Sequence, residues 1–287
     1  MERESLLATL IVLLSGLALQ LFALWPGRVR QPVAARRLEQ WRWLILWWPT
    51  APALIVAAWL CGWALSQPDP VRAHVGVLIF VGAGTFAIVG GRAVLRAVLS
   101  LFRSSRSYGF ATVGLLLPRI VVAPELAQAL DETALQAALA HEAAHVRHRD
   151  PLRIWLAQFV TDLQWPWGSA QRRLTAWLAS LEQARDDEAR DAGVTGADLA
   201  AAVLGTLRFQ SRAGPCGPGA AATLIGQPEA LAARIARLLK PLPDSTLEAE
   251  PPYLMVAGSL AMVCVAAGAL GVACGERLID SLLAMSS

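Results

Sequence analysis

Four long apolar stretches constrain what this chain can fold into more than any other feature. They lie at about 6–25, 43–65, 75–89 and 253–272, and the third continues as a helix through Leu101. A helix of about 20 apolar residues crosses the ~30 Å hydrocarbon core of a bilayer. The chain is also 55% hydrophobic and only 16% charged. The sequence therefore predicts four transmembrane helices, the first an uncleaved anchor because acidic residues outnumber Arg3 at its start.

Tryptophan and arginine mark the edges of these stretches. Tryptophan favours the membrane–water boundary, so the six tryptophans in and beside the second stretch predict an aromatic belt. Cytoplasmic loops are rich in arginine, and the loop after the first stretch holds five arginines, whereas the loop before the third holds only Arg72. The tryptophans are Trp41, Trp43, Trp47, Trp48, Trp59 and Trp63, and the arginines are Arg28, Arg30, Arg36, Arg37 and Arg42.

This arginine distribution predicts the domain organisation and its orientation. Residues 1–103 should form three transmembrane helices with a basic cytoplasmic loop, residues 104–251 a cytoplasmic domain, and residues 252–287 the fourth transmembrane helix with a short external tail. The protein is thus expected to be a multi-pass protein of the cell (inner) membrane, with lipid as a partner. Its net charge of +3 is too small to indicate direct nucleic acid binding.

The main chemical motif, HEAAH, falls on a helix expected from Asp131, its N-cap, to about Arg149. His141 and His145 are four residues apart, so their imidazoles project from one helix face and can bind the same Zn²⁺. Glu142 between them can serve as a general base toward water. The spacing therefore predicts a zinc hydrolase site.

Two histidines leave such a site one protein ligand short. No histidine follows His148, so the missing ligand should be acidic, and a second long helix is expected at 169–192. On it Glu182 and Asp186 share a face; Glu182 could bind zinc while Asp186 accepts a hydrogen bond from a ligand imidazole. A solvated charged face explains the same spacing. His148 is a ligand, a cation at the helix end, or a group that contacts a ligand.

Four segments carry a resemblance to a known family: 114–122 (GLLLPRIVV), 141–150 (HEAAHVRHRD), 164–167 (QWPW) and 182–187 (EQARDD). They are similar to the BlaR/MecR-type regulatory membrane metallopeptidases, an antirepressor family of HExxH gluzincins. The resemblance implies a mainly α fold with a cytoplasmic, α-rich, gluzincin-like zinc peptidase domain that carries a small β element. It also implies Zn²⁺ as the cofactor and Glu182 as the third ligand.

The resemblance implies a zinc metalloendopeptidase that cleaves a cytoplasmic protein during transmembrane signalling, the substrate being a winged-helix repressor or the chain itself. The sequence departs from the family in two places. Arg185 stands where the family often has cysteine, and about fifteen residues follow the fourth stretch, so no C-terminal penicillin-binding sensor domain is expected.

Three other functions fit parts of the pattern. HtpX/Ste24-type membrane quality-control peptidases share HExxH and a downstream Glu-x-x-x-Asp. An intramembrane protease would need the motif inside an apolar span, but this helix is charged. A non-catalytic zinc-binding sensor or scaffold would not need Glu142. The strand expected at 119–123 either pairs with an extended substrate or is a plain edge strand, and the group that stabilises the oxyanion is not identified.

Overall fold

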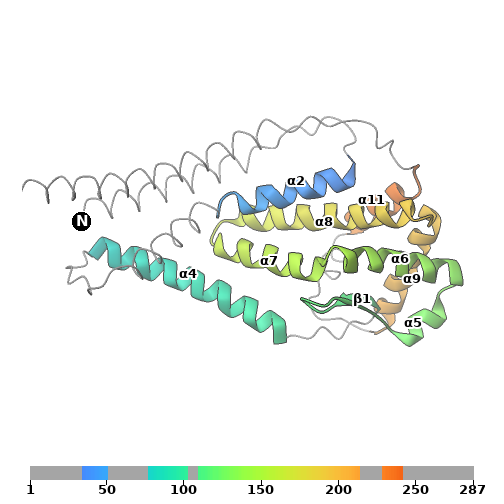
Figure 1. Ribbon diagram of the computed structural model, residues 1–287, viewed down its shortest axis with the longest axis horizontal. Helices are drawn as coiled ribbons and strands as arrows, with labels where there is room; N and C mark the ends of the chain where they lie inside the picture. Colours follow the sequence, from blue (N-terminus) through green and yellow to red (C-terminus); the bar gives the residue numbers. More distant parts are fainter. Residues whose placement is uncertain (1–33, 51–76, 103–108, 214–227, 242–287) are drawn as a thin grey trace, which may run out of the picture.

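The computed structural model describes residues 34–50, 77–102, 109–213 and 228–241, and this part of the chain is mainly helical, as predicted (Figure 1). The two strands are β1 (Phe110–Val113) and β2 (Arg119–Val122). The helices are α2 (Ala35–Trp47), α4 (Val77–Phe102), α5 (Pro124–Ala129), α6 (Glu132–Arg147), α7 (Asp150–Leu163), α8 (Gly168–Asp191), α9 (Gly196–Ala213) and α11 (Pro228–Leu238).

Helix α8 connects the two ends of the described structure. Figure 1 shows α2 along one side of α8, with α7 and then α6 along the other, and all three contact it. Helices α9 and α11 pack together at the far end, where α9 also contacts α6. The first half of α8 packs in a hydrophobic core with α2 and α7. Its second half lies beside α6.

The hydrophobic core around the first half of α8 includes residues from α2. Trp177 of α8 is fully buried, and the ring of Trp43 lies 5.0 Å from it. We expected Trp43 and Trp47 at a membrane boundary, but both pack against this core. Tryptophan buries well in lipid and in protein alike, so the apolar pattern could not distinguish the two. The buried core residues are Leu46, Ala157, Val160, Leu174, Trp177 and Leu181.

Helix α6 approaches its neighbours closely because its inward face is built of alanine. Ala137 packs with α9 and the end of α8, and Ala134 and Ala138 pack with Ala202 of α9. The predicted cap is confirmed, since the backbone N–H of Ala134 donates to Asp131 Oδ1 at 2.7 Å. The helix ends at Arg147, two residues earlier than expected, because Arg149 adopts a left-handed conformation with φ of 52°.

The predicted strand is also present, and it forms an antiparallel hairpin with β1. Phe110 is opposite Val122 and Val113 is opposite Arg119. The turn requires glycine at position 114: φ is +102°, and an added Cβ would lie 2.5 Å from the carbonyl oxygen of Leu117. Both strands contact α6, so the hairpin lies against the helix that carries the HEAAH motif.

The predicted membrane spans are only partly covered by the described residues. The first and fourth stretches, and residues 51–65 of the second, lie outside them. The third coincides with α4, which packs on α7 through Trp155 Nε1 donating to the carbonyl of Ala97 at 3.1 Å. In the described ranges, no helix combines the length and apolarity needed to cross a membrane.

Candidate metal centre

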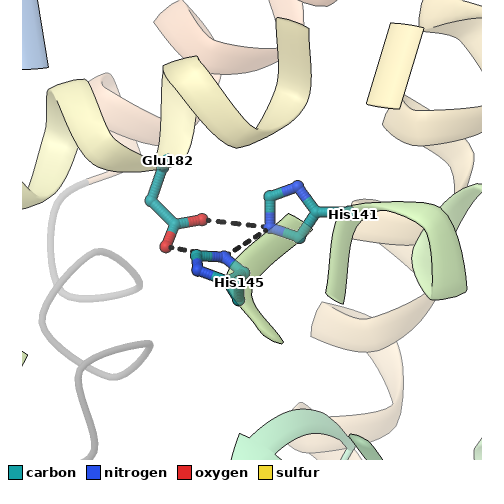
Figure 2. Close-up of side chains that lie close together, drawn as sticks. All are labelled: His141, His145 and Glu182. Atoms are coloured by element: carbon teal, nitrogen blue, oxygen red, sulfur yellow. Dashed lines mark hydrogen bonds and ion pairs between the residues drawn. The ribbon is translucent and has the colours of Figure 1, made fainter. Parts of the chain in front are cut away.

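His141 and His145 meet on the face of α6 that points toward α8. Both are buried, and their Nε2 atoms lie 3.1 Å apart (Figure 2). The helical spacing predicted this shared face. Packing of α6 through its alanines places the two imidazoles inside the protein rather than on its surface, which removes competing water from their nitrogen atoms.

Glu182 completes the group from the opposite helix. Its Oε2 lies 3.5 Å from His141 Nε2, and its Oε1 lies 3.7 Å from His145 Nε2 (Figure 2). The three potential ligand atoms all lie within 4.8 Å of one another, close enough to share one metal ion. Two imidazole nitrogens and one carboxylate oxygen are a donor set that Zn²⁺ uses in hydrolases. These three residues, the ligand group, therefore fit a zinc ion.

Asp186 lies one turn beyond Glu182, where the sequence placed it. Its Oδ1 is 3.0 Å from Nδ1 of His141, and its side chain is fully buried. Burial alone would lower the pKa of His141, but the carboxylates of Asp186 and Glu182 outweigh it and raise that pKa to about 10. Burial would likewise raise the pKa of Asp186, yet Arg234 and His141 lower it to about 2.

Asp150 lies against Nδ1 of the second imidazole, within hydrogen-bonding distance. Its Oδ2 lies 2.8 Å from His145 Nδ1, and Arg185 binds the same carboxylate. Against the effect of burial, these partners lower the pKa of Asp150 to about 2. Asp150 ends segment 141–150, which resembles the family, but no sequence pattern assigns it a role. The one available signal is an acidic residue directly after the HEAAH helix.

Arg234 of α11 was not anticipated at all. Its Nη1 lies 2.9 Å from Glu182 Oε2, and it also binds Asp186. Together with the ligand histidines, Arg234 holds the pKa of Glu182 well below its usual range despite burial. Arg234 is 48 positions beyond Asp186, and no local sequence pattern joins the two.

Glu142, the predicted base, is held by the hairpin. Thr112 Oγ1 on β1 donates to Glu142 Oε2 at 2.7 Å. His148 is placed away from the ligand group: its Nε2 lies 2.8 Å from Glu188 Oε2, and Arg147 binds the other oxygen of Glu188. The structure thus places His148 against Glu188, at the end of α6 and beside α8, rather than with the other two histidines.

Comparison with known proteins supports the peptidase class. Residues 103–166 match the family described as BlaR1 peptidase M56. The matched segment contains the hairpin, α5, α6 and α7, and so includes the HEAAH helix, Thr112 and Asp150, but it ends before Glu182. No curated protein and no solved structure matches the chain. Over residues 103–166, the family match confirms the resemblance to BlaR/MecR-type peptidases.

Proposed function

We propose that the protein is a membrane-anchored zinc metalloendopeptidase that hydrolyses a peptide bond of a cytoplasmic protein. The observation that carries this proposal is the convergence of His141 and His145 from α6 with Glu182 from α8, with their potential ligand atoms within 4.8 Å. The match of residues 103–166 to a peptidase family supports the reaction class independently of that geometry.

Each side chain of the site has a defined task in this reaction. When bound, Zn²⁺ supplies Lewis acidity that activates water and polarises the scissile carbonyl. Glu142 accepts the proton of the attacking water and delivers it to the leaving amine. Thr112 holds one oxygen of that carboxylate at 2.7 Å, which fixes its direction. Asp186 and Asp150 lie against Nδ1 of the two ligand histidines, so both Nε2 atoms face Glu182.

The hairpin is the surface that we propose for substrate binding. It contacts α6, and its strand β1 carries the threonine that holds the general base. Arg119 and Val121 of β2 are exposed at alternate positions. An extended peptide could pair with a free edge of this hairpin through backbone hydrogen bonds.

Membrane anchoring and signalling rest on the sequence. The apolar stretches at 6–25 and 253–272 are long enough to cross a bilayer, and the arginine-rich loop after the first indicates a cytoplasmic active site. The resemblance to antirepressor peptidases then favours a winged-helix repressor or the chain itself as the substrate, cleaved to relay a signal from the membrane.

Two other functions make different predictions about cleavage. An HtpX/Ste24-type quality-control peptidase would use the same site on misfolded membrane proteins. A non-catalytic zinc sensor would bind zinc without cleaving anything. Glu142 favours a peptidase, because a purely structural zinc site does not need a base.

The decisive variant is Glu142→Gln in the full-length protein. Zinc content, measured by elemental analysis, should stay at the wild-type value, while cleavage of a winged-helix repressor or of the chain itself should fall by about 10²–10⁴-fold, the usual contribution of a general base. Glu132→Gln changes an exposed glutamate on the same helix and should leave both unchanged. Equal cleavage by the wild type and Glu142→Gln, or none by either while both bind zinc, would exclude the proposed reaction.

A further inference from the structure

Behind each ligand histidine lies an aspartate whose carboxylate accepts two hydrogen bonds from one arginine. Behind His145, Arg185 donates from Nε to Asp150 Oδ2 at 2.5 Å and from Nη2 to Oδ1 at 2.9 Å. Behind His141, Arg234 donates from Nε to Asp186 Oδ2 at 2.9 Å and from Nη2 to Oδ1 at 2.7 Å. The metal centre is therefore surrounded by two parallel His-Asp-Arg arrangements.

These two arginines are buried along with their partners. Arg185 is 1% exposed, and the side chains of Asp150 and Asp186 are fully buried. The side chain of Arg234 is 18% exposed and also reaches Glu182. A buried carboxylate without a counter-charge tends to take up a proton or to move toward water. Arg185 and Arg234 supply that counter-charge, and Asp150 has a further contact with Arg153, whose Nη1 lies 3.2 Å from its Oδ1.

The arrangement is specific to the guanidinium group. Its planar fork matches both oxygens of a carboxylate, so a carboxylate held in this way cannot rotate about its terminal bond. A lysine ammonium carries the same charge but makes no planar fork. Fixed aspartates in turn fix the imidazoles, because each Nδ1 lies 2.8–3.0 Å from an aspartate oxygen. The result is that both Nε2 atoms face the same point beside Glu182.

We propose that Arg185 and Arg234 are positioning residues of the metal centre. By holding the carboxylates of Asp150 and Asp186 in place, they keep Nδ1 of each ligand imidazole against a carboxylate and Nε2 directed toward the metal. The role in metal binding rests on the proposed zinc site. The orientation of the rings does not, since it is a property of the metal-free chain.

The same helices provide matched controls. Arg237 of α11 pairs with Asp187 of α8, so it joins the helices that Arg234 joins, through a carboxylate other than the one that lies against His141. Arg190 of α8 donates to the carbonyl of Lys240 at 2.7 Å and has no part in the metal centre. Arg237→Gln and Arg190→Gln therefore report what the loss of a helix-joining arginine does by itself.

The first measurement is the zinc dissociation constant of the full-length protein, obtained by competition with a chromophoric chelator. Arg185→Gln and Arg234→Gln should each weaken zinc binding by about 10–100-fold, the usual effect of losing a group that orients a ligand. The lysine variants should not restore it, because an ammonium supplies the charge without the planar fork that holds both carboxylate oxygens. The two controls should keep the wild-type constant.

The second measurement needs no metal. The chain has only four histidines, so ¹⁵N-labelled imidazole signals of the metal-free protein can be assigned with single histidine variants. Nδ1–H of His141 and His145 should exchange slowly with solvent in the wild type and the controls. In Arg234→Gln the His141 signal should exchange rapidly, and in Arg185→Gln the His145 signal should do so.

The outcomes separate this inference from the proposed function. Slow exchange in all variants together with unchanged zinc constants would overturn the positioning role, as would an equal loss of zinc affinity in Arg237→Gln. If the wild type binds no zinc while the exchange pattern is as expected, the positioning role stands and the proposed function fails.

Discussion

Asp150 Oδ2 lies 2.8 Å from Nδ1 of His145, although the aspartate begins the next helix. The connection is made by Arg149, whose left-handed backbone conformation (φ of 52°) separates α6 from α7. This turn brings the first residue of α7 back against the last turn of α6. Asp150 therefore lies against Nδ1 of His145, as Asp186 lies against Nδ1 of His141.

Asp150→Asn should weaken zinc binding by about 10–100-fold, because the amide is a poorer acceptor than the carboxylate and carries no charge to stabilise the ligand imidazole. Chelator competition on the purified protein measures this. Asp191→Asn, an exposed change at the end of α8, is the control. An unaltered zinc constant in Asp150→Asn would contradict the role given to this contact.

Asp150 should also make the stability of the metal-free protein depend on pH. Its pKa is lowered to about 2, so its contribution is fully present above the unfolded-state pKa near 4 and is lost as pH falls from about 4 to 2. Asp150→Asn should therefore reduce the free energy of unfolding by about 2 kcal/mol at pH 7. In denaturant titrations the difference from wild type should shrink at pH 3, and a constant difference would argue against this linkage.

Zinc binding should release protons at pH 7. The pKa of His141 is raised to about 10 in the metal-free protein, so its imidazole is protonated at neutral pH and must lose that proton to bind a metal. Zinc affinity should then rise with pH, by up to about tenfold per pH unit for one proton, until the pH reaches that pKa. Titration calorimetry in buffers of different ionisation enthalpy counts the protons, and a value of zero would exclude competition at His141.

Thr112→Val should slow catalysis without affecting the metal. The substitution keeps the shape of the side chain but removes the hydroxyl that donates to Glu142 Oε2 at 2.7 Å. A hydrogen bond to a charged group is worth about 1.5–3 kcal/mol, so kcat should fall by about tenfold or more while zinc content is unchanged. Full activity in Thr112→Val would show that Glu142 is positioned by other groups.

Leu46→Ala tests whether α2 belongs to the core of the peptidase domain. Leu46 is 1% exposed and packs in the core that contains Trp177, so its truncation should cost about 2–5 kcal/mol of unfolding free energy. Leu44→Ala on the same helix, where the leucine is 37% exposed, should cost much less. Chemical denaturation of both variants measures this. If Leu46→Ala lowered the unfolding free energy no more than Leu44→Ala does, α2 would lie outside the cooperatively folding unit.

Local patterns in the sequence predicted the parts of the site that depend on helix geometry. The spacing of His141 and His145 gave their shared face, and the spacing of Glu182 and Asp186 gave theirs. The cap at Asp131 was predicted for the same reason, because a helix start depends on a few neighbouring residues. The resemblance to the peptidase family, rather than the spacing, then indicated Glu182 as the third ligand.

The sequence by itself determined which residues can share a helix face, since the helical repeat is fixed by the backbone. Only the tertiary structure decided which side chains of other helices each helix face contacts. The contacts of Arg234 with Asp186 and of Arg185 with Asp150 join positions 48 and 35 residues apart, and no local rule relates them. The packing of Trp43 against Trp177 was decided in the same way, because lipid and a protein core both favour an apolar side chain and the sequence does not say which of them it meets.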